Sequence, residues 1–234
     1  IFSGLTLITV LISLFAPAVG NFEKDLVAKG LSQAQTKMKL TRTNAENSQA
    51  TSFGVNKGVV ILGDSVALRS KDQIESSIDN VAIDAVVSRN LSTINDLHKD
   101  YADSNALAKD VVIAGGVNEI DDYKGVINKM IKNLPKGHHI IFVTPYNGSK
   151  SGSKAVSLVQ LRKYELEMAE KYDFVTVADW YQVAKENISI WNGTDGVHFG
   201  SDSDSINRGA KLYTKTIKEA IEKADKAPVK GGKK

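Results

Sequence analysis

The chain has 234 residues, 42% of them hydrophobic and 24% charged, which is enough for one globular domain with a substantial core and some additional segments. Its net charge of +3 comes from lysines spread along the chain, and aromatic residues make up only 7%, so the basic stripe typical of nucleic-acid binding is not expected. The absence of cysteine excludes disulfides, zinc sites built from thiolates and a thiol nucleophile.

Residues 1–20 carry no charged side chain, and about 20 apolar residues in a helix cross the ~30 Å hydrocarbon layer of a membrane. We therefore expect a transmembrane helix here and, because the chain starts at Ile1 without a positively charged segment, the end of a longer membrane domain. A truncated signal peptide is the alternative, favoured by the small residues Ala16 and Ala18. Lysines soon after residue 20 favour a cytoplasmic domain, but long domains translocate largely regardless of such charges, so they do not decide the orientation.

Residues 21–56 are polar, which predicts a stalk or linker. Short apolar runs then predict parallel strands at 58–62, 81–87, 110–116, 139–145 and 173–179. Segments with helical periodicity follow them, at 66–79, 91–107, 123–134, 156–172 and 203–224. This alternation predicts a three-layer α/β/α domain at 57–225 with a central parallel sheet of about five strands, followed by a disordered basic tail at 226–234.

In such a sheet, ligands bind at the carboxyl ends of the strands, where Ser65 follows the first predicted strand. Asp64 or Ser65 can cap the next helix, but a serine on a strand-turn-helix can also be a nucleophile if a histidine and a carboxylate support it. Of the four histidines, His198 fits best, because it lies in a glycine-rich loop after the last strand with Asp195 three residues before it. The other three, His98, His138 and His139, are interpreted as surface residues.

A third segment, "AGGVNEI" at 114–120, follows the third predicted strand. The side-chain amide of Asn118 and the free amides of this turn can donate hydrogen bonds to an oxyanion. Taken alone, the segment is also common turn chemistry.

Three motifs, "GDSV" (63–66), "GVNE" (116–119) and "DGVH" (195–198), occur in this order, each behind an expected strand. Together they resemble the SGNH, or GDSL-like, hydrolase superfamily over residues 57–224. The resemblance implies that Ser65 is the nucleophile, that His198 is the general base and that Asp195 orients it. It also implies an oxyanion hole formed by Asn118 and the backbone amide of Ser65.

Two positions depart from the family pattern. The family has a glycine after the second strand, where this chain has Ser88, whose amide remains a candidate oxyanion donor unless the site needs a positive φ. Glu119 replaces the acid of the usual Gly-x-Asn-Asp block and is interpreted as structural.

A membrane helix, a stalk and an SGNH domain in succession resemble the C-terminal part of bacterial membrane acyltransferases that O-acetylate cell-wall polysaccharide. The resemblance implies an extracytoplasmic domain anchored in the bacterial membrane through residues 1–20. A membrane acyltransferase domain would deliver the acetyl donor, and the acceptor would be peptidoglycan, at the C6 hydroxyl of N-acetylmuramic acid, with no cofactor or metal.

Trp191 and Tyr146 lie on loops near the expected cleft and can stack on sugar rings or serve packing alone. The same serine triad would also serve an esterase acting on carbohydrate or lipid esters, and the fold does not separate the two. A non-catalytic wall-binding module is a further alternative.

Overall fold

The computed structural model describes residues 53–118, 122–149 and 152–232. The predicted membrane helix and most of the predicted stalk lie outside these residues. Within them, no helix is both long and apolar enough to cross a membrane. Asn56, which the sequence assigns to the stalk, is already buried, and its carbonyl oxygen accepts a hydrogen bond from the backbone amide of Lys109.

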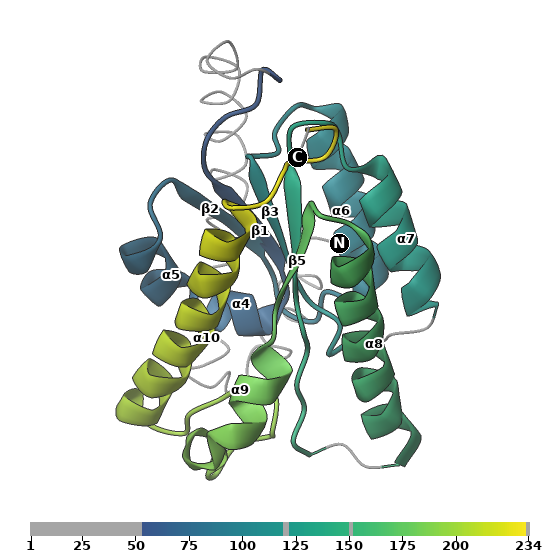
Figure 1. The fold of residues 1–234 in the computed structure, drawn as a ribbon. Helices are drawn as coiled ribbons and strands as arrows, with labels where there is room; N and C mark the ends of the chain where they lie inside the picture. The colour runs from purple at the N-terminus through teal and green to yellow at the C-terminus, as the bar shows by residue number, and fades with distance from the viewer. Residues whose placement is uncertain (1–52, 119–121, 150–151, 233–234) are drawn as a thin grey trace, which may run out of the picture.

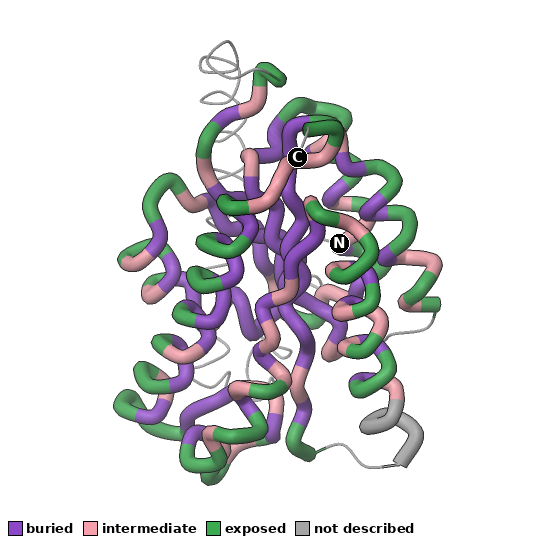
Figure 2. Tube along the Cα trace, in the orientation of Figure 1, coloured by how far each residue is buried: buried purple, intermediate pink, exposed green. Residues whose placement is uncertain are grey.

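A parallel sheet of five strands in the order β2-β1-β3-β4-β5 forms the centre of the domain (Figure 1). Its strands are β1 (Val59–Gly63), β2 (Val81–Ala85), β3 (Asp110–Ala114), β4 (His139–Val143) and β5 (Val175–Ala178). They are almost completely buried (Figure 2), as expected when helices cover both faces of a parallel sheet. This confirms the predicted α/β fold with its central parallel sheet.

Helices form a layer on each face of the sheet (Figure 1). The first layer contains α4 (Ser65–Arg69), α5 (Lys71–Ser77), α9 (Trp180–Glu186) and α10 (Ser203–Ala224). The second contains α6 (Leu91–Asp103), α7 (Tyr123–Asn133) and α8 (Gly152–Lys171). Successive strand residues point to opposite faces, so Ile61 packs in the first core and Leu62 in the second.

The predicted helix at 66–79 is two helices that meet at Ser70. The backbone amide of Ser70 donates to the carbonyl oxygens of Val66 and Ala67, and its φ of −91° and ψ of 0° end the first helix. Helix α9 and the 3₁₀ helix η2 (Ile188–Trp191) were not predicted, because elements this short show no clear periodicity.

At the edge formed by the amino ends of the strands, two expectations are wrong. His98, His138 and His139 are all buried rather than on the surface. Residues 226–232, expected to be a disordered tail, lie against this edge: the backbone amide of Lys230 donates to the carbonyl oxygen of His138, and His139 Nε2 lies 3.1 Å from the carbonyl oxygen of Ala227.

Candidate active site

The turn between β1 and α4 places Ser65 at the start of a helix. The carboxylate of Asp64 caps α4 by accepting a hydrogen bond from the backbone amide of Val66, at 2.9 Å. A Cβ at Gly63 would lie 2.6 Å from the Cβ of Ala67, so only glycine lets the helix fold back this closely on the strand. Capping thus falls to Asp64, which leaves the hydroxyl of Ser65 for another partner.

Asp64 is fully buried, and this burial raises the pKa of its carboxyl to about 7, although hydrogen bonds from the amides of Val66 and Ala67 act in the opposite direction. Its Oδ1 faces the helix start rather than a reacting group. Asp64 therefore serves the turn that presents Ser65.

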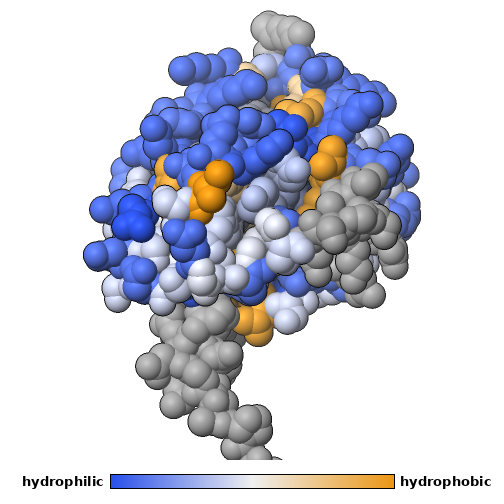
Figure 3. All heavy atoms as spheres, turned by 90° about the horizontal axis from the view of Figure 1, so that it is seen from below, coloured by the Kyte–Doolittle hydropathy of each residue, from blue (hydrophilic) through white to orange (hydrophobic). Residues whose placement is uncertain are grey.

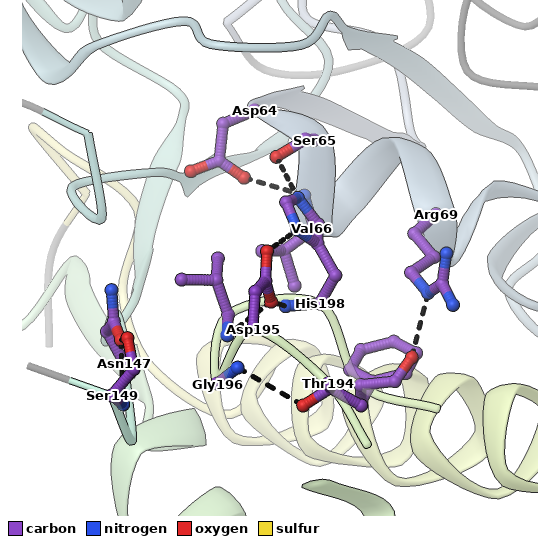
Figure 4. Close-up of polar contacts among 12 residues, drawn as sticks. Asp64, Ser65, Val66, Arg69, Asn147, Ser149, Thr194, Asp195, Gly196 and His198 are labelled. Carbon is purple, nitrogen blue, oxygen red and sulfur yellow. Dashed lines mark hydrogen bonds and ion pairs between the residues drawn. The ribbon is translucent and has the colours of Figure 1, made fainter. Parts of the chain in front are cut away.

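The partner of Ser65 is His198 (Figure 4). Ser65 Oγ lies 2.7 Å from His198 Nε2, and His198 Nδ1 lies 2.7 Å from Asp195 Oδ2. Asp195 Oδ1 accepts hydrogen bonds from the backbone amides of Val197 and His198. Partial burial acts to raise the pKa of Asp195, but the hydrogen bonds from His198 and Val197 outweigh it and hold that pKa below its ordinary value. A carboxylate in this position favours the tautomer with the proton on Nδ1, which leaves Nε2 free to accept the serine proton.

Two contacts fix the loop that carries Asp195 and His198. Arg69, one turn after Ser65 on α4, donates from Nε to the carbonyl oxygen of Phe199 and from Nη2 to that of Gly200, both at 2.8 Å. These two carbonyls follow His198 directly, so Arg69 ties the serine helix to the histidine loop.

The second contact joins the loop after β4 to the histidine loop: the backbone amide of Gly148 donates to the carbonyl oxygen of Gly196 at 2.8 Å. Gly196 has a φ of +80°, and a Cβ there would lie 2.5 Å from the backbone nitrogen of Ser149. Glycine at 196 therefore permits both the turn and the close approach. Neither of these two contacts was predicted from the sequence.

The amide of Ser65, one predicted oxyanion donor, lies at the start of α4, and the other two predicted donors lie on the loops after β2 and β3. Ser88 is exposed and has a φ of +59°, so this position has the left-handed backbone that glycine adopts most easily, and serine adopts it here. The side-chain amide of Asn118 donates to the carbonyl oxygen of Arg89 at 3.2 Å, and Arg89 in turn donates to the carbonyl oxygens of Gly63 and Asp84. Arg89, which the sequence did not single out, thereby anchors the Ser88 loop to β1 and β2. An amide has two N–H groups, so Asn118 retains one for a ligand.

Glu119, interpreted from the sequence as structural, lies outside the described residues. Trp191 and Tyr146 are half-buried and belong to an aromatic cluster, with their ring centroids 5.0 Å apart. The indole nitrogen of Trp191 donates to the carbonyl oxygen of Ala184, and Tyr146 also packs edge-to-face on Tyr181. These contacts favour the packing role over sugar stacking.

The site lies at the carboxyl edge of the sheet. Figure 3 shows the molecule from this side: most of the described surface is hydrophilic or intermediate, and the hydrophobic residues on it are separated from one another. A serine follows β1 of this parallel sheet and is hydrogen-bonded to a histidine, which is paired with an aspartate three residues before it. This arrangement defines an SGNH-type serine hydrolase or acyltransferase.

Comparisons with known proteins place the chain more closely. No family model matches it. A solved structure, the C-terminal catalytic domain of Streptococcus pneumoniae peptidoglycan O-acetyltransferase A (OatA) with a methylsulfonyl adduct, is 44% identical with a TM-score of 0.73, and the match covers 75% of this chain and 98% of that one. The chain therefore belongs to the SGNH superfamily and, within it, to the family of OatA-type C-terminal catalytic domains.

Two further proteins are less similar. A member of the lipolytic G-D-S-L family from Veillonella parvula shares the fold with a TM-score of 0.57 at 15% identity, covering 71% of this chain and 98% of that one. The Bacillus subtilis (strain 168) protein named "Putative peptidoglycan O-acetyltransferase YrhL" is 28% identical over 165 residues, which is 70% of this chain. The chain spans only 24% of the length of that relative.

Proposed function

We propose that this chain is an O-acetyltransferase that moves an acetyl group, through an acyl-enzyme on Ser65, to a hydroxyl of a cell-wall glycan. The observation that carries the proposal is the chain of contacts from Ser65 Oγ to His198 Nε2 and from His198 Nδ1 to Asp195, each 2.7 Å. The 44% identity to an OatA catalytic domain supports peptidoglycan as the acceptor.

In the first half-reaction, Ser65 Oγ attacks the acetyl carbonyl of the donor while His198 Nε2 takes the hydroxyl proton. The developing oxyanion would be stabilised by the backbone amides of Ser65 and Ser88 and by the side-chain amide of Asn118. The bond from the carbonyl carbon to the donor oxygen then breaks, and His198 returns the proton to that oxygen. Asp195 stabilises the transient imidazolium.

In the second half-reaction, a sugar hydroxyl replaces the donor. His198 Nε2 takes its proton as its oxygen attacks the acetyl-serine, and the bond to Ser65 Oγ breaks. The serine then recovers its proton from His198. We propose the C6 hydroxyl of N-acetylmuramic acid as the acceptor.

The partners follow from the same family. A membrane acyltransferase domain would deliver the acetyl donor, the catalytic domain would lie outside the cytoplasm, and residues 1–20 would anchor it in the membrane. Each of these remains part of the proposal, because the described residues begin at 53.

An esterase is the second candidate, since water can replace the sugar at the acetyl-enzyme with the same residues. His198 does not distinguish transfer from hydrolysis, because it activates a sugar hydroxyl and a water in the same way.

The test supplies an activated acetyl ester to wild type and to Ser65→Ala, with and without oligosaccharides that contain N-acetylmuramic acid. We expect wild type to add the mass of one acetyl group to the sugar, and Ser65→Ala to lose at least about 10⁴-fold in rate, because no nucleophile remains. Acetate release without acetylated sugar would favour the esterase. No turnover in either protein would contradict catalysis and favour a wall-binding module.

A further inference from the structure

A groove of about 890 Å³ opens beside the catalytic pair, with His198 and Asp195 on one wall. Its other walls are α4 and α5, through Arg69, Gln73 and Ser76, and the start of α10, through Asn207. We propose that this groove binds neutral, hydroxyl-rich sugar residues next to the one that is acetylated. The inference rests on the proposed function, to which it adds the location and chemistry of the acceptor subsite.

The assignment of the groove to the acceptor follows from the proton transfers of a serine acyltransferase. The same imidazole must protonate the departing donor oxygen and deprotonate the incoming hydroxyl, so both oxygens pass on the side of the acyl carbon that faces the histidine. Two of the proposed oxyanion donors, Ser88 and Asn118, come from the loops after β2 and β3 instead. The body of the acceptor therefore needs room beside His198, which is where the groove lies.

The lining matches sugars in chemistry. Gln73 and Asn207 line the groove with amides that can both donate and accept hydrogen bonds, as sugar hydroxyls and acetamido groups do. Ser76 and Thr194 also line it, and their hydroxyls, which donate to the carbonyl oxygens of Gln73 and Trp191, have acceptor capacity for a sugar hydroxyl. The volume lies within the ~300–1,000 Å³ range of small-molecule sites, so a short oligosaccharide segment fits.

The charges of the groove disfavour an anionic ligand. Three carboxylates line it, those of Asp72, Asp195 and Asp202, against the one guanidinium of Arg69, whose hydrogen bonds to carbonyl oxygens hold it in place without cancelling its charge. The negative sign disfavours carboxylate-bearing groups at this point of the acceptor. Neutral N-acetylhexosamine residues suit it best.

The first experiment compares Gln73→Trp with Gln182→Trp in the purified chain. The first change fills the groove, and the second places the same bulky residue at an exposed position of α9 that does not line it. We expect Gln73→Trp to lower the ratio of acetylated sugar to released acetate about ten-fold, because it removes contacts of the acceptor, whereas Gln182→Trp keeps the wild-type ratio. If Gln73→Trp destabilises the fold, Asn207→Ala makes a smaller change to the same groove, and we expect it to lower the ratio about three-fold.

An unchanged ratio in both groove variants would overturn the proposal. So would an equal fall of transfer and acetate release, because that result would place the effect on the catalytic pair.

The second experiment measures binding without catalysis. In a Ser65→Ala background, a neutral N-acetylglucosamine tetramer is titrated and followed by NMR. We expect shifts at the groove residues, an affinity that depends little on salt, and binding about ten-fold weaker in Gln73→Trp. Shifts confined to other surfaces, or binding that Gln73→Trp leaves unaltered, would contradict the inference. If wild type releases acetate but never acetylates a sugar while the tetramer binds here, the proposed transfer fails and the groove assignment stands.

Discussion

Two histidine–aspartate pairs lie at opposite edges of the same sheet. At the carboxyl edge, His198 Nδ1 is 2.7 Å from Asp195 Oδ2, and at the amino edge, His139 Nδ1 is 2.7 Å from Asp110 Oδ1. By this contact alone the two pairs are alike.

The difference is in the second ring nitrogen and in access. Nε2 of His198 faces the hydroxyl of Ser65, and its side chain is 22% exposed, whereas Nε2 of His139 faces the carbonyl oxygen of Ala227, and its side chain is 1% exposed. A hydroxyl can give its proton to the imidazole and attack, but a backbone carbonyl cannot. A histidine–aspartate pair therefore indicates a catalytic site only when a nucleophile and a route for substrate complete it.

The sharpest test makes the same substitution in both pairs. In Asp195→Asn, Oδ1 still accepts from the loop amides, but the side-chain NH₂ faces His198 Nδ1 and forces the proton onto Nε2. We expect kcat for acetyl-ester turnover to fall about 10³–10⁴-fold, as for a wrong tautomer in other serine triads. In Asp110→Asn the amide can present either its oxygen or its NH₂ to His139, so we expect normal activity and an unfolding free energy within about 1 kcal/mol of wild type.

Both variants are assayed by steady-state kinetics and by urea unfolding. A loss of activity in Asp110→Asn comparable to that in Asp195→Asn would remove the distinction between the two edges.

A second test moves the loop that carries Asp195 and His198 without changing either side chain. Gly196→Ala puts a Cβ 2.5 Å from the backbone nitrogen of Ser149, so the loop must shift. We expect about 10²-fold lower kcat, because displacement of a catalytic group by about 1 Å has this effect. Gly193→Ala is the control: its φ of +67° gives similar backbone strain, but its Cβ meets Ser201 only at 3.4 Å, so the loss should be at least several-fold smaller. Equal losses in the two variants would assign the effect to backbone strain alone.

Arg69 offers a milder version of the same test. Arg69→Met removes both hydrogen bonds to the loop that follows His198, and we expect kcat to fall about ten-fold with a smaller change in KM. Arg69→Lys should recover part of this loss, because an ammonium keeps the charge but lacks the rigid fork that reaches both carbonyls. Wild-type kcat in Arg69→Met would show that the loop holds His198 without it.

The smallest expected effect on activity is at the amino edge. His98 is fully buried, neither ring nitrogen has a hydrogen-bond partner among the described residues, and burial lowers its pKa to about 4. The unfolded chain binds a proton near pH 6.5 and the folded chain does not, so His98 costs stability as the pH falls below 6.5.

The variant His98→Leu removes this pH-dependent loss of stability. We expect the unfolding free energy of the variant minus that of wild type to increase by about 2 kcal/mol from pH 7 to pH 5, as measured by urea unfolding at each pH. The kcat of the variant should equal that of wild type. A constant difference across this range would show that His98 titrates normally.

The sequence predicts what is local. The order of strands and helices follows from hydrophobic periodicity, and Ser65, Asp195 and His198 could be identified because each motif follows a strand at the edge where parallel sheets bind ligands. The structure brings these three side chains together.

The supports of the site were not predictable, because their partners are backbone atoms far away in the sequence. Arg69 bonds carbonyls 130 and 131 residues further on, and Gly196 matters through a close approach to the loop after β4. No residue type at either position signals such a contact. The buried histidines were missed for a similar reason: His139 pairs with Asp110 from a neighbouring strand, and the tail that covers it is polar by composition.

The tail and the first described residues meet at one corner of the domain. Phe53 packs next to Gly137, and the carbonyl oxygen of Lys230 accepts a hydrogen bond from the amide of the same glycine. Both described ends are therefore at the amino edge (Figure 1), whereas Ser65 follows the opposite end of β1, a five-residue strand that spans about 17 Å. A tether joined at either of these ends would therefore attach to the domain on the side away from Ser65.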